Sequence, residues 1–399
     1  MRILVLSPEI PFPPFSGGRI RTCHLLRALA LRYELTLVGF SYGKIEERPQ
    51  FPIDVISVPW ERPELYEQME CGDSIASVRA AEKLTYEIDE PWFASVLESP
   101  AMEATLREVG GKKFDAVLIE HTNMGRFLHC LPPGVPKILD LHNVYSLMAR
   151  RSLKGKLDGE TTDLVLEAER TSRFEQRVAS ACTLCLACSE LEASAVRNLL
   201  GIEHVEVVPN GVDTAYFRLW DDPPDSGNLL FTGTMDYPPN VEAVEYFVSD
   251  ILPLIRQKDL AVTFHIVGAK PTERVCLLAS DAVVVHGGVA DIRPYYRSAE
   301  IVVVPVLHGG GTRLKILEAA ACARPIVTTS FGVEGLAFAA GKDLVIADDA
   351  SDFASAVISL RKDALRSKEL GMQARGISLR YDWERIGRQF CEIVECLLC

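Results

Sequence analysis

The sequence lacks the features that mark several large classes of protein. Its apolar runs fall short of the roughly 20 residues that span a bilayer, and the apolar run at its start is too short for a signal peptide. A net charge of −13 argues against general nucleic-acid binding, although a local basic patch is compatible with it. We therefore expect a cytoplasmic protein that does not bind nucleic acid.

The eleven cysteines also lack the spacing of a disulfide framework. The densest group is Cys182, Cys185 and Cys188, and thiolates at such a spacing can hold an iron–sulfur cluster. This segment has the pattern of a strand, on which the outer two side chains face away from the middle one. We therefore interpret the three as buried structural thiols rather than as metal ligands.

What is present is enough apolar material for two domains, since 48% of the 399 residues are hydrophobic. Short apolar runs alternate with helical segments in both halves, which predicts an α/β protein with two doubly wound parallel sheets. A polar stretch with two prolines, residues 221–227, separates the halves. The expected strands are 3–6, 35–38, 55–58, 116–119, 138–139, 184–187, 205–208, 229–231, 263–267, 283–285, 301–304, 326–328 and 344–346.

The most informative stretch is residues 308–321, HGGGTRLKILEAAA, which follows the apolar run 301–305. Gly309, Gly310 and Gly311 predict a loop of bare backbone, and Thr312 is expected to cap the helix that follows. Free N–H groups at the positive end of a helix dipole suit a phosphate group.

Three charged side chains extend this pattern. Arg313 and Lys315 add positive charge beside the glycine loop, and Glu318 lies among leucine and alanine, where a carboxylate is desolvated unless it is hydrogen-bonded. Sugar hydroxyls are good donors to such a group. An ordinary strand–turn–helix with a surface glutamate is the alternative, but the combination favours a nucleotide-phosphate site.

A second glycine pair, Gly17 and Gly18, stands just before a helix predicted to run to about residue 31. The loop before it is long and rich in proline, so it is not a dinucleotide-binding fingerprint. Its N–H groups could face a ligand with the help of Arg19, or the loop could simply lead into the helix. The residues alone leave both interpretations open.

Ionisable residues follow two of the predicted strands. Glu120 and His121 follow one, and Asp140 and His142 follow another. Open parallel sheets bind ligands at the carboxyl ends of their strands, and histidine is suited to proton exchange near neutral pH. Such groups can also be satisfied by loop hydrogen bonds, but two strand ends in one domain favour a site.

A basic stretch, Arg150, Arg151, Lys154 and Lys156, comes next. Most charge runs are solvated surface. Contact with an anionic acceptor or a lipid headgroup is the alternative.

Several segments together resemble a known family, glycosyltransferase family 4, also called group 1. The match is looser in the first half, where it rests on the Gly17–Gly18 loop, EHTNM at 120–124 and DLHNV at 140–144. In the second half the matching segments are VVPNGVD (207–213), FTGTMDYPPN (231–240), FHIVG (264–268), HGGVADIRPYYRSAEIVVVP (286–305) and GGGTRLKILEAAACARPIVTTSFGVEG (309–335).

The resemblance implies the GT-B fold, in which two Rossmann-like domains face each other across a cleft. It implies an acceptor-binding domain over 1–208, a nucleotide-sugar-binding domain over 209–380 and a C-terminal helix in 381–399 that packs back on the first domain. The activity implied is transfer of a sugar, with retention of configuration, from a nucleotide-diphosphate sugar to a glycan or lipid-linked acceptor. A cytoplasmic location at the inner face of the membrane, with peripheral contact, would fit such an acceptor in polysaccharide or cell-envelope synthesis.

The resemblance also assigns roles to residues. The family's Glu-x7-Glu element places its second glutamate at Glu318, implied to hold the ribose, but its first falls on Gly310. The family's Arg and Lys after the first strand of this domain are absent, so Arg313 and Lys315 are the expected groups at the diphosphate. His121, with Glu120 beside it, is implied to contact the sugar or the acceptor. The implied donor-binding residues are Gly309, Gly310, Gly311, Thr312, Glu318, Gly233, Thr234, His286, Val289 and Arg293.

No cofactor is expected, and the sequence shows no Asp-x-Asp motif placed to hold a metal ion at the diphosphate. Two other functions stay open. A nucleotide-sugar epimerase has the same architecture and needs no acceptor, and Gly310 would also suit a non-catalytic sugar-nucleotide-binding protein.

Overall fold

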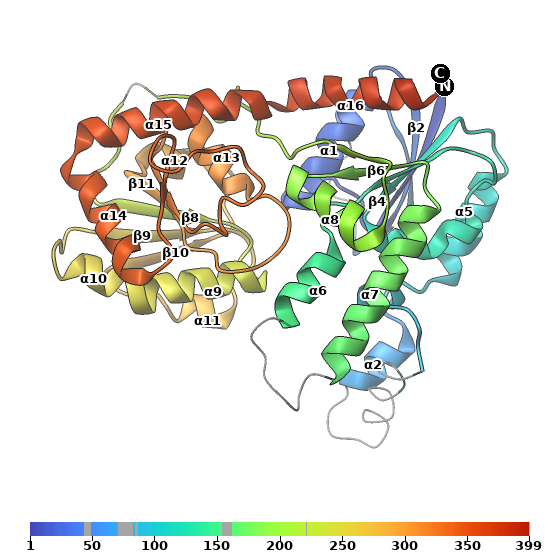
Figure 1. The fold of residues 1–399 in the computed structure, drawn as a ribbon, viewed down its shortest axis with the longest axis horizontal. Coiled ribbons are helices and arrows are strands. Elements are labelled where there is room, and N and C mark those ends of the chain that lie inside the picture. Colours follow the sequence, from blue (N-terminus) through green and yellow to red (C-terminus); the bar gives the residue numbers. More distant parts are fainter. Residues whose placement is uncertain (44–48, 71–82, 84–86, 154–161, 221, 399) are drawn as a thin grey trace. The chain divides into compact units, whose positions relative to one another are not determined.

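The computed structural model describes residues 1–43, 49–70, 83, 87–153, 162–220 and 222–398 (Figure 1). The chain forms two compact units. The first unit comprises residues 1–209 and 387–399, and the second unit comprises residues 210–386. In the described part of the chain, no helix is both long and apolar enough to cross a membrane.

The first unit is built on a sheet of seven parallel strands in the order β3-β2-β1-β4-β5-β6-β7. Its central strands β1 and β4 are almost entirely buried, as expected for a sheet covered on both faces. The strands are β1 (Arg2–Ser7), β2 (Glu34–Ser41), β3 (Asp54–Pro59), β4 (Ala116–Glu120), β5 (Lys137–Asp140), β6 (Leu184–Ala187) and β7 (Val205–Val207).

The second unit contains a six-stranded parallel sheet in the order β10-β9-β8-β11-β12-β13. Every residue of β11 is buried, which explains the uninterrupted apolar run in the sequence. The strands are β8 (Asn228–Thr232), β9 (Thr263–Val267), β10 (Val283–Gly287), β11 (Ile301–Val304), β12 (Ile326–Thr328) and β13 (Val345–Ile346). His286 and Gly287 therefore lie inside β10, not after its end as the sequence suggested.

Helices connect the strands in both units (Figure 1). Ser189 caps α8, since its side chain accepts a hydrogen bond from the Glu192 N–H at 3.2 Å. The helices of the first unit are α1 (Gly17–Leu29), α2 (Glu64–Glu70), α4 (Trp92–Ser95), α5 (Pro100–Gly110), the 3-10 helix η1 (Thr122–Cys130), α6 (Tyr145–Leu153), α7 (Thr162–Ser180) and α8 (Glu190–Leu200).

The connection between β8 and β9 contains α9, a π-helical segment and α10 in succession. The last helix, α16 (Trp383–Leu398), lies within the expected range 381–399. Trp383–Ile386 belong to the second unit and the rest to the first. The second unit's other helices are α9 (Pro238–Tyr246), η2 (Phe247–Ile251), α10 (Leu252–Arg256), α11 (Glu273–Cys276), α12 (Arg293–Ser298), α13 (Leu314–Ala321), α14 (Ala350–Lys362), α15 (Ala364–Ser378) and η3 (Leu379–Tyr381).

The strand order fixes where each sheet can bind a ligand. In each sheet the first strand, β1 or β8, lies between the second strand and the fourth, so the chain connections diverge on its two sides. Crevices form at such switch points, outside the carboxyl ends of the strands. The loops after β1 and β4 meet at this edge in the first unit, and the loops after β8 and β11 meet there in the second.

Two local predictions need correction. Gly17 and Gly18 form the first turn of α1 rather than a loop before it, since Ser16 accepts the helix-capping bond from the Arg19 N–H at 3.4 Å. Thr312 does not cap α13, because that helix begins at Leu314 and has Arg313 at its cap position without a side-chain capping bond. The Thr312 hydroxyl instead accepts a hydrogen bond from Asn210 Nδ2 at 2.9 Å.

The prediction of buried structural cysteines is confirmed. The side chains of Cys182, Cys185 and Cys188 are no more than 5% exposed, and burial raises the pKa of the Cys182 thiol to about 12. Cys182 precedes β6 and Cys188 follows it, so the predicted alternation along one strand fails for both residues. The three do not form a group of metal ligands within the described residues.

Candidate functional site

A buried ion pair underlies the switch point of the first unit. Arg21, on the inner face of α1, donates from Nε and Nη2 to the two oxygens of Asp140, each at 2.8 Å. Arg21 is 1% exposed and Asp140 is fully buried at the end of β5. Burial opposes ionisation of Asp140, but the charge of Arg21 outweighs it and lowers the pKa of the carboxyl group. Asp140 is thus held as a carboxylate.

Glu120, at the end of β4, is buried beside this pair. Its Oε2 lies 2.7 Å from His142 Nε2 and accepts a hydrogen bond from the Thr22 hydroxyl at 2.8 Å. Its Oε1 is buried and has no hydrogen-bond partner among the described residues. Burial and the nearby charge of Asp140 raise the pKa of Glu120 to about 8, and burial lowers the pKa of His142 to about 4. At neutral pH Glu120 is therefore mainly protonated and His142 neutral, so one proton is shared along the Glu120–His142 hydrogen bond.

His121 stacks on His142, with ring centroids 3.7 Å apart and ring planes 23° from parallel. Burial, with the neighbouring His142, keeps the pKa of His121 well below its usual value, so its ring is a neutral proton acceptor. Both residues have positive φ, 64° at His121 and 58° at His142. Such backbone strain costs about 1–3 kcal/mol per residue and is concentrated at functional sites.

The glycine pair of α1 lies against these rings. A β-carbon on Gly18 would be 3.4 Å from His121 Nε2 and 3.7 Å from His142 Nδ1, so α1 and the two histidines approach closely at this point. Gly17 precedes it in the first turn. The Arg19 side chain is paired with Glu9 at 2.5 Å and stacks on Phe15 at 4.1 Å.

Glu120, Asp140 and His142 are also ligand types that bind metal ions, and their ligand atoms lie within 4.8 Å of one another. Here the guanidinium of Arg21 already occupies both oxygens of Asp140, and His142 bonds directly to Glu120. The charges of the group are balanced without an added cation. We therefore interpret it as a proton-sharing network rather than a metal site.

Lys315 forms the centre of the second unit's switch point. Its ammonium donates to Asn240 Oδ1 at 2.7 Å and lies 3.9 Å from the centre of the Phe231 ring. Asn240 in turn donates to the Thr234 carbonyl at 2.9 Å. A β-carbon on Gly233 would lie 3.1 Å from Lys315 Nζ, so the amine sits directly beside the end of β8. Burial, with the nearby charge of Arg313, lowers the pKa of Lys315 to about 7.

Glu318 lies one turn further along α13. Its Oε2 accepts a hydrogen bond from the Tyr296 hydroxyl at 2.7 Å, and that hydroxyl also lies 2.8 Å from the Thr232 hydroxyl. Burial raises the pKa of Glu318, although the Tyr296 bond opposes this shift. Tyr296 thus supplies a donor to Oε2 from within the protein and orients the carboxylate, whereas the sequence pointed to sugar hydroxyls as the donors.

The glycine loop precedes α13. Gly309 and Gly311 have φ of 122° and 66°, a conformation that side chains disfavour, so glycine is required at both. Arg313 donates to the Gly311 carbonyl, and its guanidinium lies 4.7 Å from the centre of the Phe331 ring. Gly310 lies between the two strained glycines and is half-buried.

The other predicted donor residues form separate groups. His286 Nε2 lies 2.9 Å from His265 Nδ1, and its ring contacts Tyr295. Arg293 is bidentate to Asp291 and stacks on Tyr216 at 4.2 Å. Val289 is half-buried in the loop after β10. The structure thus brings Gly233, Thr234, Arg313, Lys315 and Glu318 close together, with His286 and Arg293 held by other partners.

Sequence reasoning missed three residues that these contacts reveal: Arg21, Asn240 and Tyr296. For Arg21 a signal existed, because it shares the 3.6-residue apolar stripe of Leu25 and Leu29, where a charge must be buried and paired. Asn240 and Tyr296 stood inside the family-like segments without a pattern of their own.

Comparison with known proteins identifies the family of this chain. The model described as Glycosyltransferase Family 4 matches residues 15–216, a little over half of the chain. The chain belongs to glycosyltransferase family 4. A second model, Glycosyl transferases group 1, matches residues 226–363, so the family pattern covers parts of both units.

Two curated relatives of this family 4 chain match it over part of its length. A D-inositol 3-phosphate glycosyltransferase of Catenulispora acidiphila is 27% identical over 63% of this chain and 62% of its own. The phosphatidyl-myo-inositol mannosyltransferase of Mycolicibacterium smegmatis is 30% identical over 53% of this chain and 56% of its own. The chain therefore spans about three-fifths of the length of these relatives.

Among solved structures, HepE from Anabaena in complex with UDP-glucose has a TM-score of 0.71 at 14% identity. The match covers 99% of this chain and 100% of HepE. At this identity the likeness shows the fold alone, which is GT-B with two Rossmann-like units, as the sequence predicted.

Proposed function

We propose that this family 4 chain transfers a sugar from a nucleotide-diphosphate sugar to an acceptor, with retention of configuration at the sugar. The observation that carries the proposal is the buried Lys315 amine, which Asn240 holds beside the end of β8 with the Glu318 carboxylate one turn away. A buried amine that is only partly protonated at neutral pH gains its full charge when an anion binds beside it, which suits a diphosphate.

The donor would bind at the second unit's switch point. Lys315, Arg313 and the N–H groups of the glycine loop and α13 would neutralise the diphosphate, and Glu318 would accept a bond from a ribose hydroxyl. Lys315 would take the role of the family's basic residues after β8, because its Nζ would lie 3.1 Å from a β-carbon at Gly233, directly after that strand. The HepE complex, with UDP-glucose as its named ligand, supports a donor of this class.

The chemistry needs charge stabilisation more than it needs a nucleophile. Cleavage of the bond between sugar and diphosphate builds negative charge on the phosphate, and Arg313 and Lys315 would stabilise it. Retention would follow if the acceptor attacks from the face that the diphosphate leaves, with a phosphate oxygen taking the acceptor's proton. No metal ion or cofactor is required for these steps.

The first unit would supply the acceptor side. The neutral His121 ring can accept a hydrogen bond from a sugar or acceptor hydroxyl, with Glu120 and His142 fixing its position from behind. The phosphatidyl-myo-inositol relative makes a lipid-linked acceptor reasonable, which would place the protein at the inner face of a membrane. Arg150 and Arg151 on α6 suit such a surface, whereas Lys154 and Lys156 lie outside the described residues.

Incubation with a panel of uridine and guanosine diphosphate sugars tests the proposal, first without an acceptor and then with glycan and lipid-linked acceptors. We expect slow release of nucleoside diphosphate in the first case and a glycoside of unchanged anomeric configuration in the second. Isomerised donor without acceptor would identify an epimerase, and donor binding without any product would identify a binding protein. Either outcome would refute the transferase proposal.

The position of the donor is tested separately with Glu318→Ala. This change removes the partner of the ribose hydroxyl, so the affinity for nucleoside diphosphate should fall by about ten- to a hundredfold, the equivalent of a lost hydrogen bond to a charged group. Asp281→Ala, which changes an exposed carboxylate just before β10, serves as the control in calorimetry. Equal affinities of the two variants would exclude Glu318 from the site.

Nucleoside diphosphate binding should also weaken as pH rises. Free Lys315 has a pKa of about 7, and a bound diphosphate raises it, so binding above neutral pH requires uptake of a proton. We expect the affinity to fall by roughly tenfold or more between pH 7 and pH 9. In Lys315→Arg, whose guanidinium stays charged, the same titration should be nearly flat. A flat profile for the unmodified protein would contradict this assignment.

A further inference from the structure

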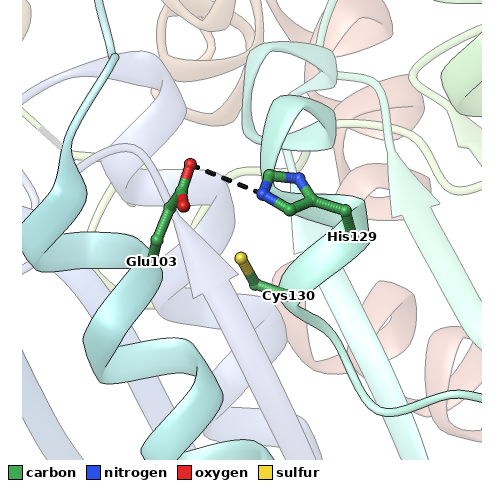
Figure 2. Close-up of side chains that lie close together, drawn as sticks. All are labelled: Glu103, His129 and Cys130. Atoms are coloured by element: carbon green, nitrogen blue, oxygen red, sulfur yellow. Dashed lines mark ion pairs between the residues drawn. The ribbon is translucent and has the colours of Figure 1, made fainter.

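A second group of metal-ligating side chains lies in the first unit, on α5 and at the end of η1 (Figure 2). It consists of Glu103, His129 and Cys130. One ligand atom of each lies within 4.8 Å of the others, and Figure 2 shows the three side chains directed toward a common space. Glu103 and His129 are partly exposed to solvent, whereas Cys130 is 6% exposed.

The hydrogen bond on the far side of the imidazole determines what this group can bind. His129 Nδ1 lies 3.1 Å from the backbone carbonyl of Arg126, which only accepts, so Nδ1 carries a proton. In the neutral ring Nε2 is then an acceptor, and it faces Glu103 Oε1 at 3.4 Å. A second proton on the ring or a metal ion would satisfy both acceptors at this separation. A backbone carbonyl on the other ring nitrogen is also how proteins commonly orient a metal-binding histidine.

The carboxylate and the thiol fit the same arrangement. Glu103 Oε2 accepts a hydrogen bond from Arg107 at 2.8 Å, which orients the carboxylate and leaves Oε1 toward His129. Cys130 Sγ lies beside these two groups and is buried, so the thiol would be the inner ligand of an ion bound there.

We propose that Glu103 Oε1, His129 Nε2 and Cys130 Sγ bind a zinc ion, with a fourth position open to solvent. A thiolate, an imidazole and a carboxylate are the ligand types that zinc takes, and the two anions balance its charge. On binding, the Cys130 S–H bond breaks, the sulfur bonds to the metal and its proton is released to water.

The ion would join two elements of the first unit. η1 is a 3-10 helix of nine residues, longer than the three or four at which such helices usually end, so its own hydrogen bonds hold it weakly. Its first residue follows His121, and its last two are the proposed ligands His129 and Cys130. Zinc would therefore fasten the far end of η1 to α5 and restrict the segment that carries His121. This site is separate from the diphosphate, at which no metal is expected.

The test uses the full-length protein and the metals alone. Addition of Co²⁺ should give one equivalent of tightly bound ion with the charge-transfer absorption of a cobalt–thiolate bond, and Zn²⁺ should displace it. Cys130→Ser should abolish this absorption, and His129→Gln and Glu103→Gln should each weaken Zn²⁺ binding at least tenfold in calorimetry. Cys276→Ser, an exposed cysteine on α11 in the second unit, should bind as the unmodified protein does.

Absence of cobalt–thiolate absorption in the unmodified protein would overturn the proposal, as would unchanged absorption in Cys130→Ser. If Cys130→Ser does not fold, His129→Gln decides, because His129 is exposed and tolerates substitution. Unweakened Zn²⁺ binding by His129→Gln would then refute the site.

Discussion

Replacing His121 by glycine should lower turnover by roughly ten- to a hundredfold, because a sugar or acceptor hydroxyl loses the group that accepts its hydrogen bond. The neutral ring of His121 is packed between the His142 ring and Gly18. Among the described residues, no other aromatic ring stacks on it. The measurement is kcat with saturating donor and acceptor. Glycine keeps the positive φ of this position accessible, so the loss would reflect the missing ring and not a displaced backbone.

Comparison with His121→Ala separates catalysis from strain. Both variants lack the ring and should be equally inactive. At φ 64° alanine is disfavoured, so the glycine variant should be more stable by about 1 kcal/mol in urea unfolding. His204→Gln, which changes an exposed histidine of the same unit, should retain full turnover. Near-normal turnover of His121→Gly would exclude the proposed role, and equal stabilities would refute the strain.

Arg21→Met should destabilise the first unit by about 3–5 kcal/mol, because it leaves Asp140 as a buried carboxylate without its partner. The guanidinium also donates to the Val208 carbonyl at 2.8 Å, so the chain leaving β7 loses an anchor as well. The free energy of unfolding, measured in urea at pH 7, reports the loss. Arg32→Met, which breaks an exposed ion pair with Glu395, should leave the unfolding midpoint nearly unchanged.

The pH dependence distinguishes a lost charge partner from lost packing. In the unmodified protein the pKa of folded Asp140 is below its unfolded value, so its contribution is present above that unfolded value and is lost as pH falls. In Arg21→Met the guanidinium no longer outweighs burial, so the folded pKa of Asp140 rises and the deficit should shrink as pH falls from 7 to 5. Adding Asp140→Asn should restore part of the stability. A deficit that is constant with pH and unaffected by Asp140→Asn would point to packing alone.

The sheets could be predicted from the sequence because buried parallel strands appear in it as short, continuous apolar runs. Each of the 13 strands in the described residues, from β1 to β13, overlaps an expected run, and β6, β9, β11 and β12 coincide with theirs. Helix starts were less predictable. The rule that a threonine caps a helix failed at Thr312, since a bond from Asn210, 102 residues away in sequence, uses that hydroxyl instead.

The site could be predicted only in part, for a related reason. Glu120, His121, Lys315 and Glu318 stand at strand ends or in a glycine-helix pattern, so local sequence marks them. Their partners are brought near by folding alone: 119 residues separate Arg21 from Asp140, and 75 separate Asn240 from Lys315. The neutral state of His142 and the lowered pKa of Lys315 depend on those partners and on burial, which no local pattern encodes.

The burial of the cysteines has a practical consequence. Among the nine described cysteines, Cys276 and Cys396 are exposed, Cys23 is half-buried and the other six are buried. A maleimide dye added near neutral pH should reach the exposed thiols first, one on α11 in the second unit and one near the end of α16 in the first. The natural sequence thus already carries a fluorophore attachment point on each half of the molecule.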